Sequence, residues 1–399
     1  MHAPAPPAFW PSPMIGQARL IRAAFEGSDM AACAQALVAR AENGVVEAGA
    51  ALDLSTILLL LQRSEEALKL QHDVLQGHRH FKLRSNPPDA RTRVLVIVTA
   101  GDLMANTPID FLLNDPGFSV EYLFVLPGQD VPPQLPDHDV TVIGIAHSCA
   151  NTPILEALCE ATESWRRPVF NHPRGVLRTS RHGVAEALAD SPGVLAPRIV
   201  RISRSSLAAA GGKLPQGLAF PVLIRPIDTH AGNDLRRITD TSALNDALIA
   251  SNAEDLYVTQ FCDYRSPDGS YRKYRIALID GVPFLCHMAV RDHWMIHYLN
   301  AGMLDDPRKQ AEEAAAMAEF DGGFAQRHAQ AFAEIHRRLG LDYLVLDCAE
   351  SRDGRLLIFE ADTGMIVHDM DSVDIYPYKA PQMRKVFAAF QRALASRGG

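Results

Sequence analysis

The sequence predicts a protein of mixed α+β and α/β class in three parts: an N-terminal helical region, a small parallel α/β domain and a two-lobed antiparallel domain. Three observations predict this order. Apolar residues recur at helical spacing up to residue 82, β-branched runs alternate with helical stretches over 92–170, and Asp-Gly pairs separate apolar runs after residue 260. The expected boundaries are 1–14 for a flexible tail, 15–88 for the helices, 89–170 for the α/β domain and 171–399 for the last domain.

Composition and charge exclude several classes of protein. With 399 residues, the chain is long enough for two or three domains of roughly 150 residues each. An apolar content of 47% with 22% charged residues excludes a disordered chain and supplies a large core. The net charge of −8 argues against a general nucleic-acid or anionic-membrane binder, which would carry a basic patch.

The cysteines and the apolar runs indicate where in the cell the protein is found. The six cysteines include no CxxC pair, so reduced thiols are a simpler interpretation than disulfides or a zinc site. The longest apolar run, Ile57–Leu61, is far too short to cross a bilayer. Because the N-terminus also lacks a basic-then-apolar signal pattern, we expect a soluble cytoplasmic protein.

The N-terminal region combines a proline-rich tail with helices. Five prolines within 1–14 predict a mobile or extended tail. Apolar residues recur at helical spacing over 15–82, and the segment 51–76 resembles a tetratricopeptide-type helix pair. Only about one and a half such units fit, whereas at least about three are normally needed for an independent solenoid. The helices are therefore either a structural cap on the rest of the chain or a module that docks a partner.

Residues 92–170 alternate strands with helices, which predicts a parallel sheet. The first run, Arg93–Thr99, follows a linker at 84–91 and is continuously β-branched, as is typical of a strand covered on both faces. The lack of a glycine-rich turn argues against a dinucleotide site. Further strands are expected at 120–126, 140–145 and 168–170, and helices at 108–113 and 153–164.

The second half of the chain predicts antiparallel pairing. Asp-Gly is a strong hairpin signal because both central residues of a type I′ turn have positive φ. Three such pairs separate apolar runs, at 268–269, 280–281 and 353–354. With helices expected at 306–319 and 324–339, the pattern predicts an α+β domain in two lobes.

Asp347, Glu360 and Asp362 form the most informative pattern. If Asp353-Gly354 is a two-residue loop, Asp347 and Glu360 lie opposite each other with Cβ atoms about 5 Å apart, and Asp362 shares their face. Like charges so close are destabilising unless a cation neutralises them, and Mg²⁺ takes oxygen ligands, so the pattern predicts a magnesium site. The alternatives are a carboxylate that faces solvent or pairs with Arg or Lys, and a one-residue slip in register.

Four cationic residues lie where they could meet phosphates. Arg225 ends an apolar strand before a proline, which places a permanent charge at the strand mouth. Lys273 and Arg275 share one face of a strand, and Arg291 lies on the strand after the 280–281 hairpin. These last three could clamp an acyl phosphate as charge develops. The alternatives are a surface arginine at a strand end and salt bridges to the many carboxylates.

Other segments carry weaker signals. The loop 228–234 could close over a ligand as a lid or be an ordinary loop, and the strand 257–261 could present backbone groups to adenine. His293 and His297 have the i, i+4 spacing of zinc ligands on a helix, but no third ligand is evident and the preceding strand favours a loop. His368 could contact substrate, act as a base or be a packed histidine.

In this order the segments resemble the ATP-grasp superfamily, in particular its glutathione-synthetase-like and ribosomal-S6-modification-like ligases, over about residues 92–395. In that family an Asn-Pro-type turn and a basic residue open the ATP-binding part, and Asn171–Pro173 and Arg181 resemble them. A proline-containing strand follows, similar to 196–198, and then a strand end with a glycine-bearing loop, similar to 220–235.

The resemblance implies a set of site residues and three departures from the family pattern. Arginine stands at both phosphate-binding lysine positions, the loop has one glycine, and Asp362 replaces an asparagine. The resemblance implies Arg275 and Arg291 as catalytic arginines, Asp347, Glu360 and Asp362 as magnesium ligands, and Arg181, Arg225, Gly232, Tyr257, Gln260, Phe261, Cys262 and Lys273 as ATP-binding residues.

The resemblance also implies an activity. The expected enzyme uses ATP and Mg²⁺ to join a carboxylate to an amine through an acyl phosphate, and releases ADP and phosphate. Two alternatives stay open: a phosphoryl transferase, and a non-catalytic nucleotide-binding or scaffold protein. The expected partners are small-molecule or peptide carboxylate and amine substrates, without nucleic acid or membrane. The α/β domain would be a pre-ATP-grasp domain on the acceptor-substrate side, and the amphipathic helices could form a homodimer interface.

Overall fold

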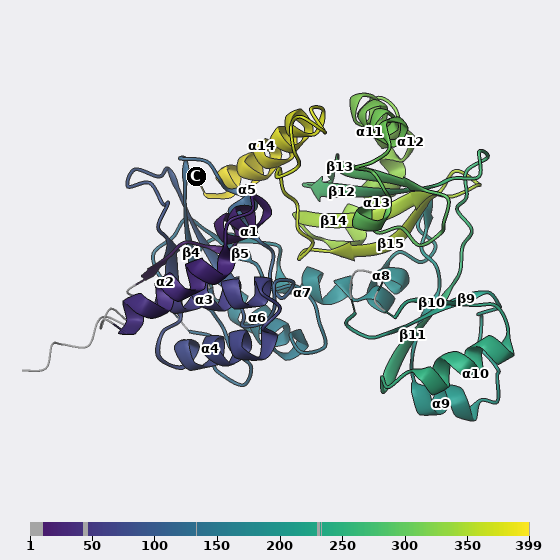
Figure 1. The fold of residues 1–399 in the computed structure, drawn as a ribbon, viewed down its shortest axis with the longest axis horizontal. Coiled ribbons are helices and arrows are strands. Elements are labelled where there is room, and N and C mark those ends of the chain that lie inside the picture. Colours follow the sequence, from purple (N-terminus) through teal and green to yellow (C-terminus); the bar gives the residue numbers. More distant parts are fainter. Residues whose placement is uncertain (1–10, 43–46, 133, 230–231, 233, 399) are drawn as a thin grey trace, which may run out of the picture.

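The computed structural model describes residues 11–42, 47–132, 134–229, 232 and 234–398. The described residues form one largely parallel sheet and two largely antiparallel sheets, so the predicted mixture of parallel and antiparallel architecture is confirmed. Figure 1 shows the parallel sheet with the N-terminal helices on one side of the molecule and the two antiparallel sheets on the other. Within the described residues, no helix combines the length and apolarity that a bilayer crossing needs.

The parallel sheet has the strand order β1-β2-β4-β3-β5-β6. Its central strand β3 (Thr92–Val98) is buried over Val94–Val98, because β4 and β5 flank it within the sheet and helices pack on both of its faces. The order brings the loops after β3 and β5 together at the carboxyl edge, where Asn106 and Ile145 form a bridge. The other elements are β4 (Phe118–Phe124), β5 (Val140–Ile143), β6 (Val169–Phe170), α5 (Ile109–Leu112) and α6 (Thr152–Thr162).

The N-terminal helices are joined to this sheet by two strands that the sequence did not predict. β1 (Ser12–Met14) pairs with β2 (His80–Leu83), which pairs with β4. The expected flexible tail is therefore wrong for Ser12–Met14, because an edge strand tolerates a proline, and residues 1–10 lie outside the described residues. The helices are α1 (Gln17–Phe25), α2 (Met30–Glu42), α3 (Ala48–Leu60) and α4 (Ser64–Gly77).

A buried carboxyl group, Asp53, and a partly buried one, Asp110, fix the start of α1. Asp53 on α3 accepts hydrogen bonds from the backbone N–H groups of Ile15 (2.8 Å) and Gly16 (3.2 Å), and Asp110 on α5 accepts one from Ala18 (2.7 Å). These contacts satisfy N–H groups that a helix start leaves without partners. They favour the interpretation of the helices as a structural cap over that of a separate docking module.

The small lobe is an antiparallel sheet in the order β10-β9-β11-β8, with its own apolar cluster. Two helices, α9 and α10, cover it and lie at the lower right in Figure 1. Its elements are β8 (Ile199–Ser203), α9 (Arg204–Ala209), β9 (Val222–Pro226), β10 (Arg236–Ile238), α10 (Thr241–Ala250) and β11 (Asp255–Gln260), and α7 (Pro173–Val176) and α8 (Arg181–Ala187) lead into it.

The large lobe is built on the sheet β13-β12-β14-β15-β7, which is antiparallel except for the pair β15–β7. The helix expected over 324–339 is broken at His328 into two helices. The elements are β7 (Val194–Leu195), β12 (Tyr271–Ile279), β13 (Val282–Arg291), α11 (Pro307–Glu319), α12 (Phe324–Arg327), α13 (Ala329–Leu339), β14 (Tyr343–Glu350) and β15 (Leu356–Asp362).

The Asp-Gly predictions have mixed outcomes. Asp280 (φ 48°) and Gly281 (φ 79°) form the two-residue turn between β12 and β13, so this hairpin is confirmed. The hairpin predicted at Asp268-Gly269 is wrong: the pair makes a tight turn in the connection from β11 to β12, which belong to different sheets. A turn signal reports local backbone geometry and does not decide which strands pair.

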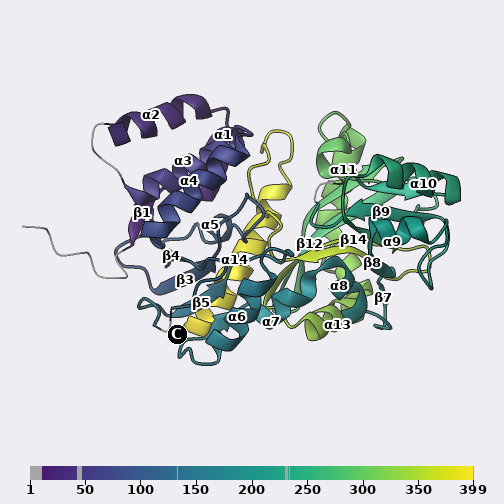
Figure 2. The ribbon, with the colours of Figure 1, turned by 90° about the horizontal axis from the view of Figure 1, so that it is seen from below.

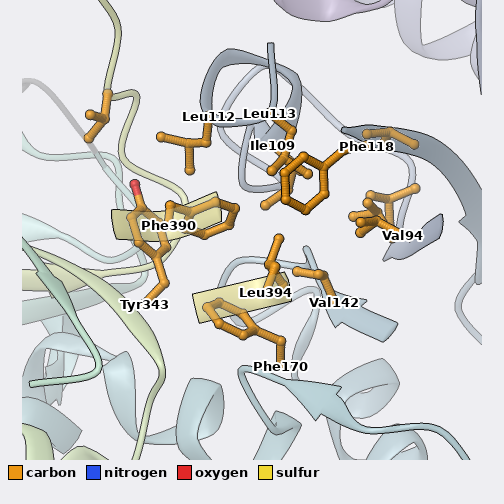
Figure 3. Packing of buried hydrophobic residues seen from close by; sticks show 14 of the residues in the cluster. Val94, Ile109, Leu112, Leu113, Phe118, Val142, Phe170, Tyr343, Phe390 and Leu394 are labelled. Atoms are coloured by element: carbon orange, nitrogen blue, oxygen red, sulfur yellow. The ribbon is translucent and has the colours of Figure 1, made fainter. Parts of the chain in front are cut away.

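The C-terminal helix α14 (Lys379–Gly398) joins the α/β domain to the large lobe. The ring of Phe390 packs edge-on against Phe170 of β6 (5.4 Å) and Tyr343 of β14 (5.1 Å). Figure 3 shows Phe390 and Leu394 between these rings and Val142. Figure 2 shows α14 running between the parallel sheet and the large lobe.

Candidate active site

A cavity of about 390 Å³ lies between the small lobe and the large sheet. Its volume falls in the usual range of a small-molecule or cofactor site, about 300–1,000 Å³. The described lining residues come from strands of both lobes, from Arg181 of α8, from the loops that follow β9, β11, β13 and β15, and from Met104 of the α/β domain. Seven of these described lining residues carry a formal charge: Arg181, Arg225, Lys273, Arg275, Asp347, Glu360 and Asp362.

Arg275, Asp347 and Glu360 lie in one row across β12, β14 and β15. The Arg275 guanidinium binds Asp347 through two bonds, Nε to Oδ1 at 2.8 Å and Nη2 to Oδ2 at 3.1 Å, and Lys273 Nζ lies 2.6 Å from Oδ2. Burial alone would raise the pKa of Asp347, but these two cations hold it well below its usual range. Asp347 is therefore an ionised, firmly anchored carboxylate.

The predicted pairing of Asp347 with Glu360 is observed, although the predicted two-residue loop is wrong. Near the turn, Glu350 pairs with Leu356 and Cys348 with Ile358, which is one residue out of the predicted register. A β-bulge then restores the predicted register, so that Asp347 lies opposite Glu360. The physical reason is the turn, which needs positive φ only at Gly354, so five residues and not two connect the strands.

Glu360 is paired with Arg181, the first residue of α8. Arg181 Nη2 lies 2.7 Å from Glu360 Oε1, and Nη1 lies 3.5 Å from the backbone oxygen of Phe359. Burial would raise the pKa of Glu360, but the Arg181 charge lowers it overall. The local cause of this placement is the Ser180 cap, whose Oγ accepts from Gly183 N–H and starts the helix at Arg181.

Asp362 is the one carboxyl group of these three whose pKa is raised. It is 8% exposed, and burial together with the nearby charge of Glu360 raises its pKa to about 7. Its Oδ1 accepts a hydrogen bond from Gly364 N–H at 2.9 Å. A nearby cation would favour the ionised form of this group.

Arg225 ends β9 inside the cavity wall, where it is 7% exposed. Its Nε and Nη2 lie 3.1 and 3.0 Å from Thr229 Oγ1, so its guanidinium is turned toward its own loop. Burial and the charge of Arg181 lower its pKa to about 10. The alternative of a surface arginine is excluded by this burial.

The glycine-bearing loop is held near its start by the α/β domain. Asp228 accepts a hydrogen bond from Cys149 N–H of the α/β domain at 3.0 Å. Gly232 has φ +75°, and a Cβ there would lie 3.5 Å from Met295 Sδ. The residues His230, Ala231 and Asn233 lie outside the described residues, so closure of the loop as a lid stays a prediction.

The strand expected to hold adenine reaches the cavity through Gln260, Phe261 and Cys262. The Gln260 amide bridges backbone groups of Ala219 (3.0 and 3.1 Å) and so holds the neighbouring segment. Tyr257 does not line the cavity: its hydroxyl lies 3.3 Å from His182 Nδ1, and burial raises its pKa to about 12. Thr259, which shares the face of Tyr257 two residues further along β11, lines the cavity instead.

Arg291 also lies outside the cavity lining. Its Nη1 donates to the backbone oxygen of Met295 at 3.3 Å, so it holds the loop that begins beyond β13. This loop contributes Trp294, Met295, Ile296, His297 and Asn300 to the cavity. The loop predicted around His293 and His297 is therefore part of the site.

Several lining residues were not predicted. Met104, Met365 and Ile366 come from loops after β3 and β15, and Leu223, Leu235, Leu357 and Phe359 add apolar wall. Apolar residues that face a cavity look the same in sequence as residues that face a core, so no local signal marks them.

The carboxylates suit magnesium by chemistry, since all supply hard oxygen donors. Among the described residues, however, no three His, Cys, Asp or Glu side chains lie close enough to hold one ion together. In this structure Asp347 is bound by Arg275 and Lys273, and Glu360 by Arg181. A metal would therefore need these carboxylates to exchange partners.

Comparisons with known proteins found no matching family model and no matching curated protein. Solved structures with a similar chain course include the VanG D-Ala:D-Ser ligase from Enterococcus faecalis (TM-score 0.48, 12% identity, 77% of this chain and 100% of that chain). A D-alanine–D-alanine ligase from Bacillus anthracis complexed with ATP has a TM-score of 0.47 and 10% identity (77% and 98% covered). A RimK domain ATP-grasp protein from Sphaerobacter thermophilus has a TM-score of 0.42 and 14% identity (75% and 98% covered).

Proposed function

We propose that the protein is an ATP-dependent carboxylate–amine ligase of the ATP-grasp type. One observation carries the proposal. The cavity between the two lobes is lined by apolar residues beside the end of β11 and, among the described residues, by four cations and three carboxylates. With all carboxylates ionised, the cavity still has one more positive than negative charge, which suits a polyanion together with a metal ion.

The nucleotide would lie along the small lobe. Adenine would contact the backbone of Gln260–Cys262 and the apolar wall of Leu223 and Phe261. The phosphates would be bound by Arg181, Arg225 and Lys273, which all line the cavity. Arginine supplies a planar fork that binds two phosphate oxygens at once.

We propose Asp347, Glu360 and Asp362 as the residues that would hold Mg²⁺. The donor chemistry supports this, and so does the raised pKa of Asp362, about 7, which a neighbouring cation would lower. A bound Mg²⁺ would supply charge neutralisation between the carboxylates and the phosphates. Arg181 would then turn from Glu360 to the phosphates, a short movement within the same cavity.

The proposed chemistry has two steps. A substrate carboxylate oxygen attacks the γ-phosphorus, the bond to the bridging oxygen breaks, and ADP leaves with that electron pair. An amine then attacks the carbonyl carbon of the acyl phosphate, phosphate leaves, and the amine loses its proton to give the amide. Arg275 would stabilise the charge on the transferring phosphoryl group, whereas Arg291 would act only by positioning the loop at Met295.

A second candidate is a nucleotide-binding protein without turnover. It is favoured by the observation that all four cations already bind protein oxygens: Arg275 and Lys273 bind Asp347, Arg181 binds Glu360, and Arg225 binds Thr229. Phosphoryl transfer that stops at a phosphorylated product is the remaining alternative and differs only in the last step.

Further parts of the proposal concern the whole chain. We propose a cytoplasmic enzyme with the four-part division given above, in which 89–170 is the pre-ATP-grasp domain and 171–399 the ATP-grasp domain. The packing of α3 against α4 supports a tetratricopeptide-like character for 15–88. Substrates would be small-molecule or peptide carboxylates and amines, and a homodimer is one possible assembly.

The test is a thermal-shift titration with ATP, with and without Mg²⁺. A ligand at a hundred times its Kd stabilises by about 2.7 kcal/mol, so binding is readily detected. The proposal expects a magnesium-dependent shift in the wild type that Glu360→Gln loses. Glu350→Gln is the matched control, because Glu350 lies on the same sheet and is paired with Arg327 at 3.1 Å, outside the cavity lining. Absence of any shift in a folded sample would contradict the proposal.

A further inference from the structure

A buried group of charged and hydroxyl side chains lies in the large lobe and takes no part in the proposed chemistry. At its centre are Lys379, the first residue of α14, and Glu313 of α11, which are 2% and 0% exposed. Figure 1 shows α11 and α14 above β12 and β13, and both helices pack against β13. A lysine and a glutamate are rarely buried so completely, because removing a charge from water is costly unless the charge is paired. Lys379 and Glu313 meet this condition through contacts with each other and with the segments around them.

Both carboxylate oxygens of Glu313 accept hydrogen bonds. Oε1 accepts from the backbone N–H of Met288 on β13 (3.0 Å), and Oε2 accepts from the hydroxyl of Tyr378, which directly precedes α14 (2.8 Å). Lys379 Nζ lies 3.6 Å from Oε1. Glu313 is therefore fixed to β13 and to the start of α14, and it places a negative charge beside Lys379.

Lys379 makes the contacts to two further segments. Its Nζ donates to the hydroxyl of Tyr298, in the loop after β13, and to Asp371 Oδ2 (3.1 Å), in the segment after β15. The ammonium group also lies over the rings of Tyr298 (4.3 Å) and Tyr376 (4.4 Å), and each ring face attracts a cation. One buried ammonium group therefore joins the loop after β13 to the segment after β15.

Both segments that Lys379 joins line the cavity. The described lining residues of the loop after β13 are Trp294, Met295, Ile296, His297 and Asn300, and those of the segment after β15 are Met365 and Ile366. Tyr298 is not among them, and its hydroxyl is bound by Lys379 instead. It lies in a tight turn in which His297 N–H donates to Asn300 Oδ1 (2.9 Å) and Asn300 N–H donates to the His297 oxygen (3.0 Å). This turn fixes two wall residues relative to Tyr298.

The loop after β13 also contacts the charged row of the site. The Tyr298 ring lies 4.6 Å from the ring of His287, which is opposite Arg275 in the register of β12 and β13. Because directly opposed residues on antiparallel strands share a face, Tyr298 packs on the face of the sheet that carries Arg275. Lys273 Nζ lies 3.5 Å from the backbone oxygen of Ile296. The position of this loop is therefore tied to the cations of the cavity.

We propose that Lys379 and Glu313 are positioning residues, which hold the loop after β13 as a preformed wall of the cavity through the Tyr298 hydroxyl. This role rests on the proposed function, because the nucleotide is the ligand that the wall would meet. The Trp294 ring packs edge-on against Phe261 (5.7 Å), at the end of β11 where the base would lie. A loop that is in place for only a fraction of the time reduces the apparent affinity by that fraction.

The first measurement reports on the loop and needs no nucleotide. The chain has three tryptophans and only Trp294 lies in this loop, so protein labelled with 5-fluorotryptophan has one ¹⁹F resonance from the loop, assigned with Trp294→Phe. Tyr298→Phe removes the hydroxyl that Lys379 binds and keeps the ring. We expect it to shift or broaden the Trp294 resonance and to leave that of Trp165 unchanged. An unchanged Trp294 resonance would overturn the positioning role.

Tyr274→Phe is the matched control for the loss of a hydroxyl. Tyr274 is half-buried on β12, packs against the ring of Phe324 (4.4 Å) and lies outside the cavity lining, so its variant should keep the wild-type Trp294 resonance. The same shift in Tyr274→Phe and Tyr298→Phe would overturn the assignment of Tyr298 as the link to the loop.

Lys379→Met removes the ammonium group itself and should alter the Trp294 resonance as Tyr298→Phe does. Its control is Lys385→Met on the same helix, where the exposed Lys385 pairs with Asp321 at 3.2 Å. Lys379→Met leaves the buried Glu313 without its cation and is the variant more prone to unfold. Tyr298→Phe keeps both charges, so it decides the question even where Lys379→Met does not fold. A folded Lys379→Met with the wild-type Trp294 resonance would overturn the role of Lys379.

The second measurement is the affinity for ATP with Mg²⁺, by calorimetric titration. Tyr298→Phe should raise the Kd by about tenfold, which corresponds to a loop that is in place about a tenth of the time. Tyr274→Phe should keep the wild-type Kd. A merely structural contact would lower the stability of Tyr298→Phe and leave the Kd of the folded protein unchanged. An altered Trp294 resonance combined with an unchanged Kd would therefore overturn the positioning role.

The proposed function and the positioning role can fail separately. If the wild type binds ATP and Tyr298→Phe binds it equally well, the positioning role is overturned and the ligase proposal stands. If the folded wild type binds no ATP, the ligase proposal is overturned, and the positioning role with it.

Discussion

Asp347 and Glu360 face each other across β14 and β15, and each is neutralised by a cation from a different part of the fold. Asp347 is bound by Arg275 and Lys273 of the adjacent strand, whereas Glu360 is bound by Arg181 at the start of α8. The pair therefore ties the large sheet to the segment that leads into the small lobe. Both links run through the cavity, so their loss should affect stability and nucleotide binding together.

Asp347→Asn should destabilise the protein by roughly 3 kcal/mol, because it leaves the charges of Arg275 and Lys273 without their buried partner. Urea unfolding measures this change. The control is Asp353→Asn, whose solvent-exposed pair with Arg355 (2.6 Å) should contribute far less. Equal effects of the two variants would show that Asp347 is not held as described.

Arg181→Gln should weaken ATP binding by at least about tenfold, since a charge-assisted hydrogen bond to an ionised group contributes roughly 1.5–3 kcal/mol. Calorimetric titration with ATP and Mg²⁺ measures the affinity. Arg181→Lys should lose less, because it keeps the charge but not the planar fork. Arg178→Gln is the control, as Arg178 bonds the backbone oxygen of Arg338 (2.9 Å), away from the cavity. An unchanged affinity in Arg181→Gln would remove Arg181 from the proposed phosphate site.

Asp53 should make the stability of the protein depend on pH. Burial raises its pKa from 3.8 to about 6, so the folded state holds an extra proton between these values. This stabilisation of roughly 3 kcal/mol is fully present below pH 3.8. It is lost as the pH rises through about 6. Relative to Asp53→Asn, the wild type should lose stability between pH 4 and 7. Asp73→Asn is the control, because Asp73 is an exposed carboxylate on α4, and its stability should change with pH as that of the wild type does. The same pH dependence of stability in all three proteins would contradict the prediction.

Gly364→Ala should weaken the contact between the α/β domain and the large lobe. The new methyl group would lie 2.7 Å from the Ala146 Cβ, and such overpacking costs about 1–3 kcal/mol. Urea unfolding measures the loss of stability. Gly322→Ala, where a Cβ meets nothing within 4 Å, is the matched control. If Gly364→Ala were as stable and active as Gly322→Ala, Gly364 and Ala146 would not lie as close together as described.

Sequence reasoning succeeded where a short segment carries the whole signal. The strand Thr92–Val98 follows from its β-branched run, and the turn at Asp280-Gly281 follows from its need for positive φ. The pairing of Asp347 with Glu360 was predicted through the wrong loop, and a bulge corrected the register. The wrong loop length shifts the register by one residue, and the bulge, which was not predicted, shifts it back.

Other features depend on contacts between distant segments and had no local signal. Ser12–Met14 becomes a strand only because β2 offers it an edge. Arg291 was expected at the cavity, but the course of the loop after β13 turns it to the backbone of Met295. Met104 reaches the site because the α/β domain closes against Gly364, which no pattern around residue 104 indicates.

The position of α14 has a consequence for synthesis on the ribosome. Val94 and Val142 belong to strands made in the first part of translation, yet their apolar cluster is completed by Phe390 and Leu394. A nascent chain of 170 residues therefore carries all strands of the parallel sheet with part of its core still open to water. The α/β domain is synthesised first, but its core is complete only after residue 394 has left the ribosome. Until then, chaperones can bind its exposed apolar surface.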